Sequence, residues 1–197
     1  MCSVLPWRQR ARILPADLYP FEALGVPSTG TTRTAILRPC QRAPKPASGT
    51  PLSKKLGIKE GDRVAIVRAP DGFRDTLGEL PDGVSVTTRA SVPRNGRLGG
   101  TLNVVIAFFR ERSELEKRLP ALMNALDVDG GLWIVWPKRA SGLETDITED
   151  TLREVALPKG LVDNKVCAID ETWSGLRLVY RMENREAVRA ERLKRYS

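Results

Sequence analysis

The chain of 197 residues is 41% hydrophobic and 28% charged, an ordinary globular composition that allows one domain with a sizeable core. It contains no histidine, which excludes Ser-His-Asp and Cys-His catalysis and every metal site that needs an imidazole ligand. The net charge of +8 comes mainly from the two ends of the chain. Residues 1–50 hold seven basic and two acidic residues, and residues 183–197 hold five basic and three acidic residues. Residues 51–182 hold 20 basic and 19 acidic residues, so this middle part is nearly neutral and a nucleic-acid-binding domain is disfavoured.

The remaining composition points to the cytoplasm. No apolar run approaches the roughly 18 residues of a membrane span, and the first residues lack the apolar segment of a secretory signal. The three cysteines, Cys2, Cys40 and Cys167, are odd in number and have no CxxC spacing. We therefore expect a cytoplasmic protein with no membrane segment, no disulfide framework and no metal site.

Proline spacing divides the chain into three parts. Residues 1–50 contain seven prolines that interrupt any helical or strand period, which predicts a disordered or loosely attached basic extension. Residues 51–182 carry regular hydrophobic patterns and form the predicted domain. Residues 183–197 are rich in Arg, Glu and Ala, which predicts a charged C-terminal helix or tail.

The first half of the domain alternates short helical segments with strands. Leu52 and Leu56 are one helical turn apart, and Gly57 suits a helix end. The apolar run at residues 104–109, in the third predicted strand, predicts burial on both sheet faces. A polar loop containing Gly96, Gly99 and Gly100 precedes it. In chain order we predict strand Arg63–Arg68, a short helix near Phe73–Leu80, strand Val84–Thr88 and strand Leu102–Phe109.

The second half begins with the clearest helix pattern. Ser113 and Glu116 have the spacing of a capping box, Pro120 predicts a kink or restart, and Asp127–Gly131 is expected to end the helix. After it we predict strand Leu132–Trp136, a helix capped by Asp146 or Thr148 and reaching about Leu157, and strands Val162–Ile169 and Leu176–Met182, joined as an antiparallel hairpin through Asp170–Gly175.

This order predicts an α/β fold, a mostly parallel sheet with helices on both faces and a C-terminal antiparallel hairpin. Gly61–Val67, Asn103–Phe108 and Leu126–Val135, followed by the hairpin, are similar to Rossmann-like methyltransferases. Three further motifs resemble an uncharacterised family common in actinobacteria, which implies no function: Trp136–Gly142, Thr145–Glu149 and Val166–Leu176.

The methyltransferase resemblance implies S-adenosylmethionine as a cofactor. The residues of this chain at the cofactor-binding positions differ from the methyltransferase pattern. Several glycines are expected after the first strand, where Arg68–Gly72 supplies one. The second strand ends at Arg89, where an acid would hold the ribose. The sequence therefore supports the fold and predicts no cofactor.

A different site is predicted where the central strands end. Open parallel sheets bind their ligands beyond the carboxyl ends of the strands. Five basic residues follow the predicted parallel strands: Arg68, Arg110, Arg112, Lys138 and Arg139. Helix starts at the same edge also favour anions. We predict a phosphate or carboxylate site formed by these five bases and Ser141, with the alternative that they form a solvated rim paired with Asp71, Glu111 or Glu144.

Tryptophans near this edge are secondary candidates. Trp133 and Trp136 should face opposite sides of the sheet, the first in the core and the second as a ligand wall. Trp173, in the hairpin connection, either folds back on the domain or contacts a partner.

Three functions fit these observations. The first is a non-catalytic or regulatory domain that binds a protein or a small anionic metabolite. The second is an enzyme for a phosphorylated or carboxylated substrate, with Arg110, Lys138 and Arg139 as clamps and Asp170 or Glu171 as acid or base. The third, a nucleic-acid binder using its tails, is disfavoured by the near-neutral domain.

Overall fold

The computed structural model describes residues 49–92, 98 and 101–196, with the side chains of residues 195 and 196 excepted. The predicted extension up to residue 48 and the glycines at 96, 99 and 100 lie outside the described residues. The described part of the chain belongs to one compact unit.

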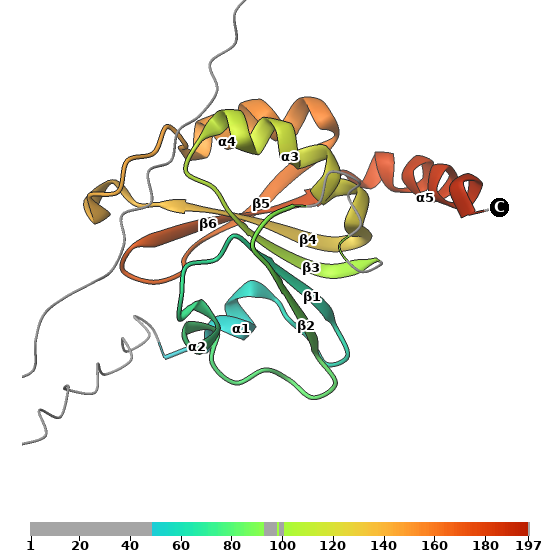
Figure 1. Cartoon of the computed structure of the whole chain (residues 1–197). Helices are drawn as coiled ribbons and strands as arrows, with labels where there is room; N and C mark the ends of the chain where they lie inside the picture. Colours follow the sequence, from blue (N-terminus) through green and yellow to red (C-terminus); the bar gives the residue numbers. More distant parts are fainter. Residues whose placement is uncertain (1–48, 93–97, 99–100, 197) are drawn as a thin grey trace, which may run out of the picture. The chain divides into compact units, whose positions relative to one another are not determined.

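A six-stranded sheet in the order β2-β1-β3-β4-β6-β5 forms the centre of the domain (Figure 1). The first four strands of that order are parallel, and β6 and β5 are antiparallel at one edge. The predicted Rossmann-like α/β fold with a C-terminal hairpin is therefore confirmed. The strands are β1 (Arg63–Val67), β2 (Ser85–Arg89), β3 (Leu102–Phe108), β4 (Leu126–Pro137), β5 (Leu161–Ala168) and β6 (Trp173–Tyr180).

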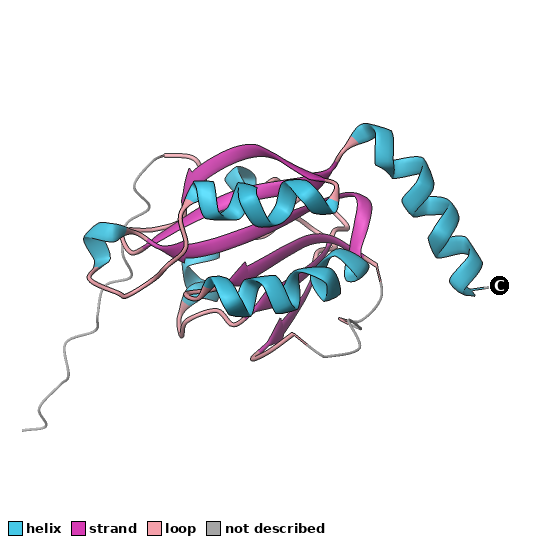
Figure 2. Cartoon of the chain, turned by 90° about the horizontal axis from the view of Figure 1, so that it is seen from above, coloured by secondary structure: helices cyan, strands magenta, loops and turns pink. Residues whose placement is uncertain are grey.

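Helices cover both faces of the sheet (Figures 1 and 2). On one face α3 and α4 bury one core cluster, and on the other α1 and α2 bury a second. The central strands β3 and β4 are almost wholly buried, as their apolar runs predict. The α-helices are α1 (Leu52–Leu56), α2 (Phe73–Leu77), α3 (Arg112–Ala125), α4 (Glu149–Ala156) and α5 (Met182–Tyr196), and two short 3₁₀ turns are η1 (Arg139–Ser141) and η2 (Leu157–Lys159).

The predicted capping box of α3 is wrong. The helix begins at Arg112, so Ser113 lies inside it, and the N-cap Glu111 makes no side-chain cap. The Asp146 carboxylate instead accepts the Arg112 amide at 2.6 Å, which replaces a local cap by a tertiary one. Pro120 does not restart the helix, which continues through it to Ala125.

The start of β4 is also earlier than predicted. The register passes from Leu102 opposite Leu126 to Val104 opposite Gly131, so the residues before Gly131 form a bulge and not a turn. Glycine is required at position 130, because a Cβ there would lie 2.7 Å from the Asn103 carbonyl oxygen of β3.

The hairpin strands each begin before their predicted start, so Trp173 and Ser174 lie in β6. The Asp170 carboxylate closes the connection by accepting the amides of Thr172 and Trp173, both at 2.7 Å. Of the two predicted caps for α4, Thr148 is the one that accepts the Thr151 amide. The C-terminal segment is helical, as α5 shows, and runs away from the sheet (Figure 2).

Candidate functional site

Arg68 follows β1 in a left-handed conformation, with φ 58°, which is uncommon for a residue with a side chain. Its amide donates to the Arg89 carbonyl, extending the β1–β2 pairing. Its guanidinium lies 3.2 Å from the Glu114 carboxylate and 5.5 Å from the centre of the Phe109 ring. The carboxyl end of β1 is thus occupied by a side chain with its own intramolecular partners.

Arg112 is paired with two acidic residues. Its Nε donates to Glu116 at 2.7 Å and its Nη1 to Glu154 at 2.8 Å. The hydrogen bond to Glu116, followed by the one to Glu154, raises the pKa of Arg112. This arginine therefore fastens α3 to α4.

Arg110 binds the loop after β4. Its Nε donates to the Glu144 carbonyl at 3.2 Å, while its own carbonyl accepts the Thr145 hydroxyl at 2.7 Å. Arg110 is exposed and holds this loop beside the end of β3.

Lys138 and Ser141 shape the turn that leaves β4. The Lys138 ammonium donates to the Asp170 carbonyl at 2.6 Å, which ties the turn to the hairpin connection. The Ser141 hydroxyl donates to the Lys138 carbonyl at 2.7 Å, closing η1. An ammonium has three donors, and Asp170 accepts one of those of Lys138.

Arg139 differs from the other predicted bases. It is exposed and makes no hydrogen bond or ion pair within the described residues. Together with Lys138 and Trp136 it lines a pocket of about 240 Å³ at the carboxyl end of β4. Arg68, Arg110, Arg112 and Ser141 do not line this pocket. Its remaining walls are Pro137, Ile147, Thr148, Glu149 and Ser174.

The first turn of α4 forms one side of the pocket. The amides of Glu149 and Asp150 have no acceptor within the described residues, whereas the Thr151 amide is capped by Thr148. The Glu149 carboxylate also lines the pocket, and its charge is opposite to that of Lys138 and Arg139. This carboxylate is paired with Arg153 at 3.4 Å.

Three of the chain's four tryptophans lie within the described residues. Trp133 packs in the α1/α2 cluster and Trp136 in the α3/α4 cluster, so they face opposite sides of the sheet. Trp136 is 7% exposed and touches the pocket by its rim. Trp173 folds back on the domain, where its ring meets Phe108 edge-on at 5.1 Å.

Other reactive groups are few in the described residues. Cys167 is half-buried against the α1/α2 cluster, and this burial raises the pKa of its thiol, which disfavours a nucleophilic thiolate. No acidic or cysteine cluster within the described ranges could hold a metal ion. No helix among the same residues is long and apolar enough to span a bilayer.

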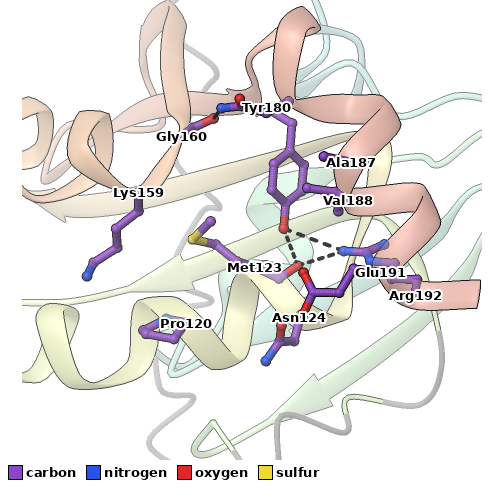
Figure 3. Close-up of a pocket in the computed structure, with 11 residues that line it drawn as sticks. Pro120, Met123, Asn124, Lys159, Gly160, Tyr180, Ala187, Val188, Glu191 and Arg192 are labelled. Atoms are coloured by element: carbon purple, nitrogen blue, oxygen red, sulfur yellow. Dashed lines mark hydrogen bonds between the residues drawn. The ribbon is translucent and has the colours of Figure 1, made fainter. Parts of the chain in front are cut away.

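A second cavity in the described part of the chain was not predicted from the sequence. It is an open groove of about 470 Å³ at the opposite end of β4, between α3 and α5 (Figure 3). Tyr180 donates to the Met123 carbonyl at 2.8 Å, and Arg192 donates to the same carbonyl at 3.0 Å. The residues that line this groove come from four separate elements, so no local sequence motif predicts the groove.

Comparison with curated proteins finds no match. Among solved structures, the chain is similar to an S-adenosylmethionine-dependent methyltransferase from Aquifex aeolicus, with 15% identity over 64% of this chain and 85% of that one and a TM-score of 0.48. It is also similar to ribosomal protein L11 methylase from Lactobacillus delbrueckii subsp. bulgaricus, at 12% identity over 65% and 74% of the two chains and a TM-score of 0.47. A third is the Methanococcus jannaschii fibrillarin pre-rRNA processing protein, at 10% identity over 68% and 70% and a TM-score of 0.47.

A family model covers most of the folded domain. It matches residues 72–182, more than half of the chain, and carries the description "Protein of unknown function (DUF3052)". The three motifs of the uncharacterised-family resemblance, Trp136–Gly142, Thr145–Glu149 and Val166–Leu176, all lie within the matched segment. The chain therefore belongs to the DUF3052 family.

Proposed function

We propose that this domain is a non-catalytic, regulatory module that binds a small anion, a phosphate or carboxylate group, in the pocket at the carboxyl end of β4. One observation carries the proposal: Arg139, alone among the predicted bases, has no partner within the described residues and lines a pocket there. A guanidinium presents a planar fork of donors that suits such oxyanions.

Two further features of the pocket support the same ligand, and its one carboxylate, Glu149, is paired with Arg153 at 3.4 Å. Lys138 adds a second positive charge, and the first amides of α4 add donors at the positive end of a helix dipole. The volume of about 240 Å³ lies below the roughly 300–1,000 Å³ of pockets that enclose drug-sized ligands. A small anion therefore fits better than a nucleotide.

The carboxyl end of β1 supports a role other than S-adenosylmethionine binding. Arg68 fills this position and is held by Glu114, and Arg89 ends β2 where an acid would be needed for the ribose.

No observation favours the enzyme or the nucleic-acid alternative. Asp170, the candidate acid or base, has a carboxylate oxygen occupied by two backbone amides and serves as a turn residue. Arg110, a candidate clamp, holds a neighbouring loop carbonyl. The positive charge that would attract nucleic acid lies mainly in the chain ends.

We expect inorganic phosphate to raise the melting temperature of the wild-type domain by roughly 3–5 °C at about ten times its Kd, because the anion binds only the folded form. Arg139→Ala should lose most of this increase and keep the melting temperature of the ligand-free protein, since its side chain is exposed. Differential scanning fluorimetry at constant ionic strength measures both.

Arg74→Ala is the matched control, because Arg74 is also exposed but lies on α2, on the other face of the sheet. It should respond to phosphate as the wild type does, which separates site binding from general salting effects. Equal stabilisation of the Arg139→Ala variant and the wild type would contradict the proposal.

A further inference from the structure

The groove between α3 and α5 has the construction of a ligand site and lies at the opposite end of β4 from the proposed anion pocket. Its apolar floor is formed by Pro120, Met123 and Val188, and Val188 packs against the α3/α4 core. The volume of about 470 Å³ is within the range of small-molecule pockets. The open groove therefore has room for an apolar body of metabolite size.

One wall of the groove is fixed by hydrogen bonds. Burial raises the pKa of Tyr180, so its phenol stays protonated and donates to the Met123 carbonyl. Arg192, whose charge opposes that shift, donates to the same carbonyl and stacks over the Tyr180 ring at 5.8 Å (Figure 3). These contacts link α5 to β6 and to the end of α3, an arrangement that favours a preformed groove.

Charge is placed at one end of the groove. Lys159 lines that end beside Pro120 and has no hydrogen bond or ion pair within the described residues, whereas Arg192, at the other end, is already committed to Met123 and Tyr180 (Figure 3). Asn124 and Asn184 add uncharged polar groups to the lining, and the one acidic lining residue, Glu191, lies near Arg192, away from Lys159 (Figure 3). An uncommitted ammonium beside an apolar floor complements a ligand with a carboxylate on an apolar chain or ring.

We propose that this groove binds an amphipathic monocarboxylate, with the apolar portion on Met123 and Val188 and the carboxylate at Lys159. The site is independent of the pocket at Arg139 and uses a different edge of the sheet. Its recognition rests on apolar burial first and on one charge pair second.

Octanoate is a suitable probe. Its binding to the full chain is monitored through amide chemical shifts in nuclear magnetic resonance spectra. Saturable shifts are expected at Gly160, Asn184 and their neighbours. Lys159→Ala should weaken binding about threefold or more, as for loss of a partly exposed charge pair. Ala187→Trp, at an exposed position that lines the groove, should abolish binding by filling it. Lys54→Ala, at an exposed lysine of α1, should leave binding unchanged.

Three further probes separate the contributions. Acetate tests the carboxylate alone, octanol the chain alone, and octylammonium the sign of the charge, and all three should bind more weakly than octanoate. The proposal is overturned if octanoate gives no saturable shifts, if Lys159→Ala binds it as tightly as the wild type, if octylammonium binds as well, or if the shifts fall instead at residues 138–142.

Discussion

Replacing Trp133 with alanine is expected to lower the free energy of unfolding by about 3–5 kcal/mol, the largest effect we predict for a single substitution. The side chain has no exposed surface and lies in the α1/α2 core cluster. Its indole Nε1 also donates to the Leu56 carbonyl at 2.9 Å, which ties the end of α1 to β4. The variant therefore creates a cavity and leaves a buried carbonyl without its donor.

Urea unfolding followed by circular dichroism measures this loss. Trp173→Ala is the matched control, because Trp173 is only half-buried and makes one edge-on contact with Phe108. It should lose clearly less stability than Trp133→Ala. A loss below about 1 kcal/mol for Trp133→Ala would show that the indole is not the anchor described here.

Gly130→Ala is expected to lower the free energy of unfolding by about 1–3 kcal/mol, because the added methyl group overpacks two paired strands. Its Cβ would lie 2.7 Å from the Asn103 carbonyl oxygen, a backbone atom that cannot rotate away. The side chain of Asn103 also accepts the Arg63 amide at 3.0 Å, so a shift of β3 disturbs β1 as well.

The comparison for Gly130 is Gly49→Ala, at a position where an added Cβ meets no atom within 4 Å. That variant should unfold at nearly the wild-type urea concentration. If Gly130→Ala did the same, the close approach of β3 to the bulge of β4 would be wrong.

The sequence predicted the strands well because their hydrophobic pattern is local. The runs in β3 and β4 are apolar on both faces, which identifies central parallel strands before any tertiary contact is known. The short connection through Asp170 likewise identified the hairpin. These features depend on neighbouring residues alone.

The errors arise where a distant residue decides the outcome. The cap of α3 comes from Asp146, 34 residues from Arg112, and not from Ser113. The early start of β4 includes Gly130, whose backbone lies close to the Asn103 carbonyl of the neighbouring strand β3. No local pattern contains either interaction, so the local capping and turn rules gave different boundaries.

The same limit applies to the candidate site. Lys138, Arg139 and Trp136 line one pocket where β4 ends, and their binding of an anion stays a prediction. The partners of the other bases are far away in sequence, with Glu114 46 residues from Arg68 and Glu154 42 residues from Arg112. Pairing of this kind decides which bases are available to a ligand, and it becomes visible only in the folded chain.

The central claim is that the carboxyl edge of this sheet takes a small anion at Arg139 and does not take S-adenosylmethionine. Amide chemical shifts of the wild-type protein, titrated separately with phosphate and with the cofactor, test it most directly. We expect saturable phosphate shifts at residues 138–142 and 148–151, and no saturable shifts with S-adenosylmethionine at millimolar concentration. Saturable cofactor shifts at residues 68–72, or phosphate shifts that never saturate, would contradict the account.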